Sequence, residues 1–297
     1  RAADVVPIIG CEMYVAPSSR HDRNPNEKKP YHMTVLAKNQ IGYSNLVKLV
    51  TAAHLEGFYY YPRIDKPLLE KHSEGLIVLS GCPSGEVPNL INQGRMEDAT
   101  AAVQWYRELF PDYHLELMEH GGVEGLPRIN QGLMELNREL DVPVVATNDS
   151  HYINKKDAPL QDILICIHTN TNINDPKRLK MDEDSYYIKS PAEMASLYPE
   201  TPAAISNSMR IAEKCELEID FSQLHLPEYN VPNGMNADEY LAKLCWDGLT
   251  QRIGQYGDEE KSRLKYELEV IKQTQYANYF LVVWDIATFV RKKDIAF

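Results

Sequence analysis

An aspartate and a histidine stand two residues apart, shortly after the apolar run at residues 143–146. The run is short and β-branched, which predicts a buried strand that delivers Asp149 and His151 at its carboxyl end. If the extended conformation continues to His151, both side chains lie on one face. A carboxylate oxygen and an imidazole nitrogen suit a divalent metal such as zinc or manganese. The alternative is that Asp149 caps the next helix and His151 is a loop residue, because Asx residues after strands commonly serve turns.

Three other residues have side chains that bind metals, and each has a simpler explanation. Glu12 interrupts the strand predicted over residues 8–15, where burial of a charge is costly unless the charge is paired or binds a metal, although a water-facing edge strand fits equally well. Cys82 ends the strand predicted at 76–82, and free cysteines are more often inert core residues than ligands. His32 opens a predicted strand instead of ending it, so strand geometry alone does not select it.

The elements around these residues alternate between strand and helix. Strands are predicted at 8–15, 31–37, 76–82, 114–118, 143–146 and 186–191, and helices at 43–53, 99–110, 129–140 and 158–168. This order predicts an α/β fold with largely parallel pairing, for which a barrel is the economical architecture. In such a barrel, chemistry is confined to the strand ends and to the loops that follow them.

Composition limits the class of protein. The 297 residues are 43% apolar and 25% charged, and no apolar run approaches the roughly 18 residues of a membrane span. Five widely spaced cysteines fit a reducing, cytoplasmic setting. The net charge of −12 argues against broad non-specific binding of nucleic acid, although a local basic channel remains compatible with it.

The chain is expected to divide near residue 220, because residues 226–234 are rich in linker residues. Residues 280–287 are too apolar to stand exposed, so we expect them to be covered by a segment outside this chain. The chain begins with Arg1 instead of Met, and residues 2–7 have neither the basic start nor the apolar stretch of a signal peptide. Residues 290–297 end on an apolar residue without a capping or turn signal, so we expect an internal fragment cut at both ends.

The aromatic segment at 57–65 allows two interpretations. It is either a packed loop or a stacking platform for bases, and its Arg63 is a candidate to meet a phosphate.

Seven short motifs, taken in order, resemble bacterial replicative DNA polymerase III alpha subunits that carry a polymerase and histidinol phosphatase (PHP) domain. They are IGCE at 9–12, HMTVLA at 32–37, GFYYYPRID at 57–65, SGC at 80–82, ATNDSHY at 146–152, YIKSP at 187–191 and YFLVVWD at 279–285. Each motif is weak alone, but their joint order and spacing are specific. The resemblance covers essentially the whole chain.

The resemblance implies a fold and a ligand set. Residues 1–220 would form a distorted (βα)7 PHP barrel that lacks its first strands, and residues 221–297 a mainly helical segment leading into the polymerase palm. Carried over position by position, the implied metal ligands are Glu12, His32, Cys82, Asp149 and His151, with zinc or manganese as the metal. Glu12 would bridge two metals, His32 and Cys82 would complete one, and Asp149 and His151 would serve the others. A His-x-His motif and further ligands would precede Arg1, so metal binding here is expected to be weak or incomplete.

The implied function is part of a DNA-directed DNA polymerase, a nucleotidyltransferase of DNA replication whose magnesium-binding aspartates would follow Phe297. The implied partners are DNA and dNTPs, the sliding clamp and other replisome subunits, and a proofreading exonuclease subunit. The PHP site itself would be a metal-dependent phosphoesterase, either a 3′–5′ exonuclease or a pyrophosphatase. Two alternatives are a stand-alone PHP phosphoesterase, which has no use for residues 280–287, and a non-catalytic scaffold that docks the proofreading subunit.

Overall fold

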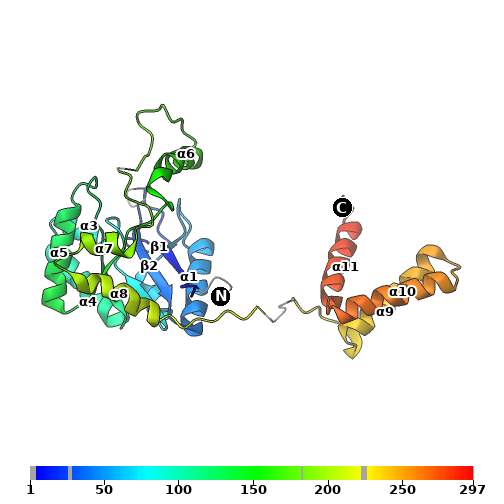
Figure 1. Cartoon of the computed structure of the whole chain (residues 1–297). Coiled ribbons are helices and arrows are strands. Elements are labelled where there is room, and N and C mark those ends of the chain that lie inside the picture. Colours follow the sequence, from blue (N-terminus) through cyan, green and yellow to red (C-terminus); the bar gives the residue numbers. More distant parts are fainter. Residues whose placement is uncertain (1–4, 26–28, 182, 222–225, 297) are drawn as a thin grey trace. The chain divides into compact units, whose positions relative to one another are not determined.

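The computed structural model describes residues 5–25, 29–181, 183–221 and 226–296, so Arg1 and Phe297, on which the expectation of cut ends rests, lie outside it. The chain forms two compact units, Arg1–Glu218 and Ile219–Phe297 (Figure 1). The first unit contains a six-stranded mixed sheet with helices packed against it. The α/β fold class predicted from the sequence is therefore confirmed.

The strands of the sheet lie in the order β3-β1-β2-β4-β5-β6. They are β1 (Gly10–Val15), β2 (Tyr31–Ala37), β3 (Arg63–Ile64), β4 (Leu76–Leu79), β5 (Tyr113–Leu117) and β6 (Val144–Ala146). The β1–β3, β4–β5 and β5–β6 pairs are parallel, but β2 runs antiparallel to both of its neighbours. The expectation of largely parallel pairing is wrong for β2, because the residues described between β1 and β2, 16–25 and 29–30, form no α-helix that would return the chain for a parallel strand.

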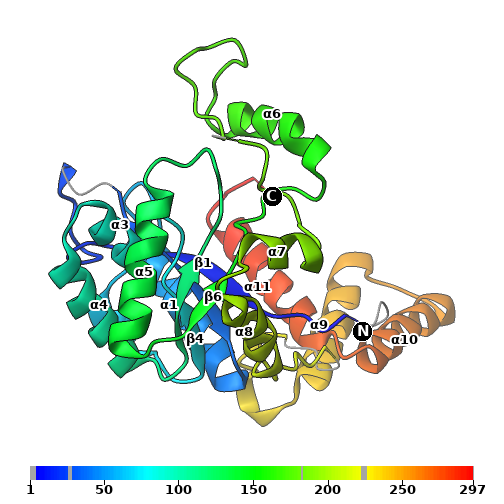
Figure 2. The ribbon, with the colours of Figure 1, turned by 60° about the vertical axis from the view of Figure 1, so that its left-hand side comes forward.

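The first unit also contains helices. They are α1 (Gln40–Leu55), α2 (Lys66–Lys71), α3 (Glu86–Asn92), α4 (Met96–Leu109), α5 (Leu126–Leu140), α6 (Ala158–His168), α7 (Pro191–Leu197) and α8 (Pro202–Glu213). Helix α1 packs against β2, β3 and β4, α8 packs against β6, and α3, α4 and α5 pack together. Helix α6 and its adjoining loop stand apart from the sheet (Figures 1 and 2).

Local sequence explains most of these boundaries. The apolar stripe of α5 buries Ile129, Leu133 and Leu136, as its helical spacing predicts. The strand expected at 186–191 is wrong: only a single bridge pairs Tyr187 with Tyr152. The chain turns there into α7, because Ser190 forms a capping box with the third residue of that helix.

The second unit is helical. It contains α9 (Ala237–Ile253), α10 (Asp258–Gln273) and α11 (Ala277–Lys292) around a small core of Leu241, Ala277 and Leu281. Residues 280–287 belong to α11, which leaves Phe280 45% exposed and Ile286 51% exposed. None of the helices described is both long enough and apolar enough to cross a membrane.

A buried carboxyl joins the strand ends of the sheet. Glu116 in β5 accepts hydrogen bonds from the main-chain nitrogen of Gly81 (3.1 Å), from Thr34 Oγ1 (3.3 Å) and from Thr147 Oγ1 (2.7 Å). Gly81 follows β4, Thr34 lies in β2, and Thr147 follows β6. Burial, reinforced by the charge of Asp149, raises the pKa of Glu116 to about 7, and these three hydrogen bonds only partly oppose the rise.

Glu116 should make the stability of the fold depend on pH. Its pKa rises from 4.5 to about 7 on folding, so its contribution is fully present below pH 4.5 and is lost as the pH rises through 7. The difference corresponds to about 3 kcal/mol of unfolding free energy. Part of this contribution is already lost at pH 5, so in urea unfolding Glu116→Gln should reduce the drop in stability between pH 5 and pH 8 by about 2.5 kcal/mol. Exposed Glu108→Gln is the control, and an unchanged drop in Glu116→Gln would contradict the assignment.

Candidate metal centre

Three of the five candidate ligands meet at one edge of the sheet. Glu12 in β1, His32 in β2 and Cys82 after β4 each place a ligand atom within 4.8 Å of the other two. His32 Nδ1 lies 2.6 Å from Glu12 Oε1 and 3.4 Å from Cys82 Sγ. His32 reaches this edge because β2 is antiparallel, so its amino end lies beside the carboxyl ends of β1 and β4.

The contacts of His32 change the proton affinities within this group. The hydrogen bond with Cys82, together with that to Glu12, raises the pKa of His32 to about 10. The same contact with His32 lowers the pKa of Glu12. The Glu12 side chain is 51% exposed, so its charge is paired and also faces water. His32 Nδ1 is thus the common contact of Glu12 and Cys82.

The donor set fits a divalent metal. A carboxylate, an imidazole and a thiolate are the ligand types that zinc accepts, at bond lengths of about 2.0–2.3 Å. Two ligands bonded at these lengths to one tetrahedral metal stand roughly 3.3–3.8 Å apart, and His32 Nδ1 lies 3.4 Å from Cys82 Sγ. Three protein ligands also leave a coordination position open, as in catalytic zinc sites.

The backbone that carries Asp149 and His151 after β6 is not extended, as it would have to be for both side chains to lie on one face. Strand β6 ends at Ala146 and Asp149 has a φ of 45°, in the left-handed region, so the extended conformation does not continue to His151 and the same-face argument is wrong. His151 Nδ1 lies 2.6 Å from the main-chain oxygen of Asp149. Asp149 caps neither of the next two helices, whose N-caps are Asn154 and Asp157.

Asp149 and His151 lie near the group formed by Glu12, His32 and Cys82, without joining it. Burial raises the pKa of Asp149, His151 acts in the opposite direction, and the charge of Glu12 raises it further. His151 in turn contributes to the lowered pKa of Glu12. The five candidates therefore share one electrostatic environment, and three of them are close enough to bind one ion.

His120 is a further histidine that the sequence argument missed, and its charge acts on the pKa of Asp149. It follows β5, and its Nδ1 lies 2.6 Å from Ser185 Oγ and 3.3 Å from Glu183 Oε1. Its Nε2 is buried and finds no hydrogen-bond partner among the described residues. The pattern that singled out Asp149 and His151, a histidine just past a strand, also applies to His120.

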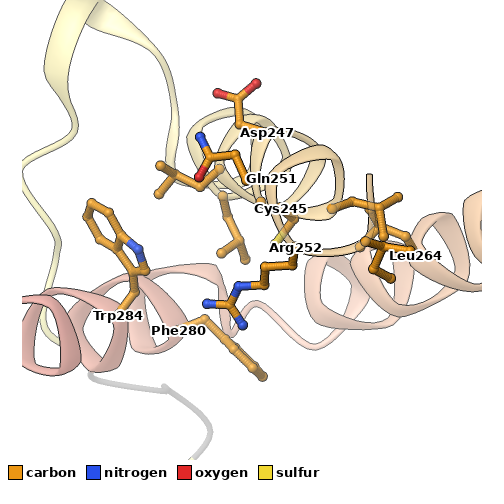
Figure 3. Close-up of a pocket in the computed structure, with 12 residues that line it drawn as sticks. Cys245, Asp247, Gln251, Arg252, Leu264, Phe280 and Trp284 are labelled. Atoms are coloured by element: carbon orange, nitrogen blue, oxygen red, sulfur yellow. The ribbon is translucent and has the colours of Figure 1, made fainter. Parts of the chain in front are cut away.

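A separate hollow lies in the second unit, between α9, α10 and α11 (Figure 3). It measures about 670 Å³ and is lined mainly by apolar side chains, including Leu244, Phe280 and Trp284. Asp247 and Arg252 are its charged members. Its lining contains no histidine and a single carboxylate, so it does not resemble a metal centre.

Comparison with known proteins assigns both units. The PHP domain family matches residues 1–120, which contain Glu12, His32 and Cys82. The family described as "Bacterial DNA polymerase III alpha NTPase domain" matches residues 239–297. The fold, the site and the first match together define a PHP domain.

Relatives extend this assignment to the whole chain. DNA polymerase III subunit alpha is 44% identical in Borreliella burgdorferi and 42% identical in Treponema pallidum, in each case over 99% of this chain. The Mycobacterium tuberculosis subunit is 36% identical, also over 99% of the chain. The chain belongs to the family of bacterial DNA polymerase III alpha subunits. It spans 26% of the length of each of these three relatives.

Metal affinity should increase with pH, because each ligand atom must lose its proton before it can bind the metal. With its pKa at about 10, His32 stays protonated from pH 6 to pH 8. Each unit of pH should therefore tighten zinc binding up to about tenfold for each proton released. Competition against a chromophoric chelator at pH 6, 7 and 8 measures this, and a Kd that is independent of pH would contradict it.

A double variant tests whether Cys82 and Asp149 contribute to the metal site. In metal content measured by mass spectrometry, the double variant Cys82→Ala, Asp149→Ala should lose the zinc or manganese that the unchanged chain retains. Cys245→Ala, a free cysteine in the second unit, is the matched control. Equal metal content in all three proteins would show that these residues form no site.

Proposed function

We propose that the chain carries a metal-dependent phosphoesterase centre that removes nucleotides from DNA 3′ ends within a bacterial replicative DNA polymerase. The convergence of Glu12, His32 and Cys82 on a common point, inside the residues matched by the PHP family, is the observation that supports this best. A bound divalent metal supplies Lewis acidity to a phosphate ester.

The residues of this centre have distinct roles in the proposal. Glu12, His32 and Cys82 hold one metal, and His32 gives up its proton when the metal binds. Asp149 and His151 are proposed ligands of further metal in the same environment. Zinc and manganese both suit a mixed oxygen, nitrogen and sulfur donor set. The half-exposed side chain of Glu12 leaves the centre open to a substrate.

The wider assignments follow from the relatives' name. We propose that the parent protein is a DNA-directed DNA polymerase that uses magnesium at aspartates outside this chain, and that it works in the cytoplasm with DNA and dNTPs. The sliding clamp, other replisome subunits and a proofreading exonuclease are its proposed partners. A stand-alone phosphoesterase is less well supported, because the relatives match 99% of the chain, second unit included.

Asp149→Ala tests the proposed activity in a full-length subunit. Removing this carboxylate should abolish metal-dependent shortening of a labelled DNA strand from its 3′ end, measured on denaturing gels. Primer extension by the same preparation should persist, because Asp149 lies in the PHP domain and not among the polymerase aspartates.

The control for this experiment is Asp258→Ala, which removes a fully exposed carboxylate from the second unit. It should leave 3′ shortening unchanged. If Asp149→Ala also retained full shortening activity, the non-catalytic scaffold would become the better description.

A further inference from the structure

A pocket opens beside the candidate metal centre. It measures about 540 Å³, within the range of about 300–1,000 Å³ typical of small-molecule sites. Its lining includes Tyr14, Lys29, Tyr31, His32, Tyr61 and Asn89. Because His32 belongs both to this lining and to the group with Glu12 and Cys82, a ligand in the pocket reaches the metal centre.

Aromatic rings form one side of this pocket. The Tyr14 ring lies 4.9 Å from the Tyr61 ring, tilted by 52°, and 5.1 Å from the His32 ring in an edge-on arrangement. Tyr61 is 43% exposed. The rings are therefore partly open to a ligand instead of being enclosed in the core. An exposed tyrosine ring can stack on any of the four nucleobases, because every base has a flat π-face.

The segment that carries Tyr61 is firmly anchored. The Arg63 side chain is buried, and it donates from Nε to the main-chain oxygen of Gly57 (3.1 Å) and from a terminal nitrogen to that of Asp22 (2.6 Å). The main-chain nitrogen of Tyr59 donates to the oxygen of Tyr61 (3.0 Å). Arg63 is thus a structural residue, and the idea that it meets a phosphate is wrong. Its guanidinium fixes the loop that presents Tyr61.

Polar groups complete the pocket. Lys29 is exposed and contributes a positive charge, and Asn89 contributes an amide that both donates and accepts hydrogen bonds. An aromatic side, a cation and a neighbouring metal centre match the base and the phosphate of one nucleotide. A purely apolar ligand would leave the ammonium and the amide unused.

We propose that this pocket is a subsite for the terminal nucleotide of a DNA strand. The base stacks on Tyr61, and the phosphate lies toward His32, within reach of Lys29. This inference rests on the proposed phosphoesterase function, because it names the part of the substrate that lies next to the metal centre. The subsite holds the base by stacking, so it accepts all four bases.

Binding of 2-aminopurine deoxyribonucleoside 5′-monophosphate to the 297-residue chain tests the subsite, since its fluorescence is quenched on stacking. Loss of one base–aromatic stack should weaken binding about tenfold in Tyr61→Leu, whereas Tyr61→Phe should bind as the unchanged chain does. Tyr60→Leu is the matched control, because Tyr60 neighbours Tyr61, is 63% exposed and does not line the pocket.

A second variant tests the phosphate end and does not depend on the packing of Tyr61. Lys29→Gln should weaken binding of the nucleotide several-fold and leave the corresponding nucleoside, which has no phosphate, unaffected. Lys71→Gln, an exposed lysine of α2, should change neither.

The outcomes separate this inference from the function on which it rests. Equal affinity for the nucleotide and for 2-deoxyribose 5-phosphate, or equal weakening in Tyr60→Leu and Tyr61→Leu, would overturn the subsite. Zinc affinity is measured on the same samples. An unchanged chain that bound no zinc would refute the metal centre, while the stacking result on the metal-free chain would still decide the subsite.

Discussion

The antiparallel course of β2 is the constraint on which the site depends. Had β2 run parallel to β1 and β4, His32 would lie at the opposite edge of the sheet, far from Glu12 and Cys82. The connection after β1 is short and forms no α-helix over its described residues, 16–25 and 29–30, whereas a parallel return needs a crossover of a dozen or more residues, usually helical. One strand reversal thus supplies the imidazole nitrogen that lies 2.6 Å from Glu12 and 3.4 Å from Cys82.

Two buried polar side chains hold the edge of the sheet in shape. Glu116 joins the residues after β4 and β6 to β2 through its two carboxyl oxygens. Arg63 fixes the loops around Gly57 and Asp22 through their carbonyl groups. Both side chains are buried. Their hydrogen bonds offset the cost of burial and hold the metal ligands and Tyr61 in position.

In the proposals above, the metal centre would bind the phosphate ester of a substrate and the adjoining pocket would bind its nucleotide. The oxygen, nitrogen and sulfur donors suit the metal that would act on a phosphate ester, and the tyrosines and Lys29 suit the nucleotide that carries it. His32 is shared by both. The relatives that share this chain are named DNA polymerase III subunit alpha, and the proposed nuclease centre would lie within such a subunit.

The sequence by itself determined the α/β class, the positions of most helices and strands, and the family, because apolar periodicity and ordered motifs are local properties of the chain. It marked Cys82 and Asp149 as residues at strand ends, but it gave no local reason to choose His32 and overlooked His120. The same-face argument for Asp149 and His151 depended on an extended path to His151, and the left-handed conformation of Asp149 interrupts that path. Only the tertiary structure decided that Glu12, His32 and Cys82 meet and that Arg63 is buried. The physical reason is that strand direction and burial arise from pairings between segments far apart in the chain.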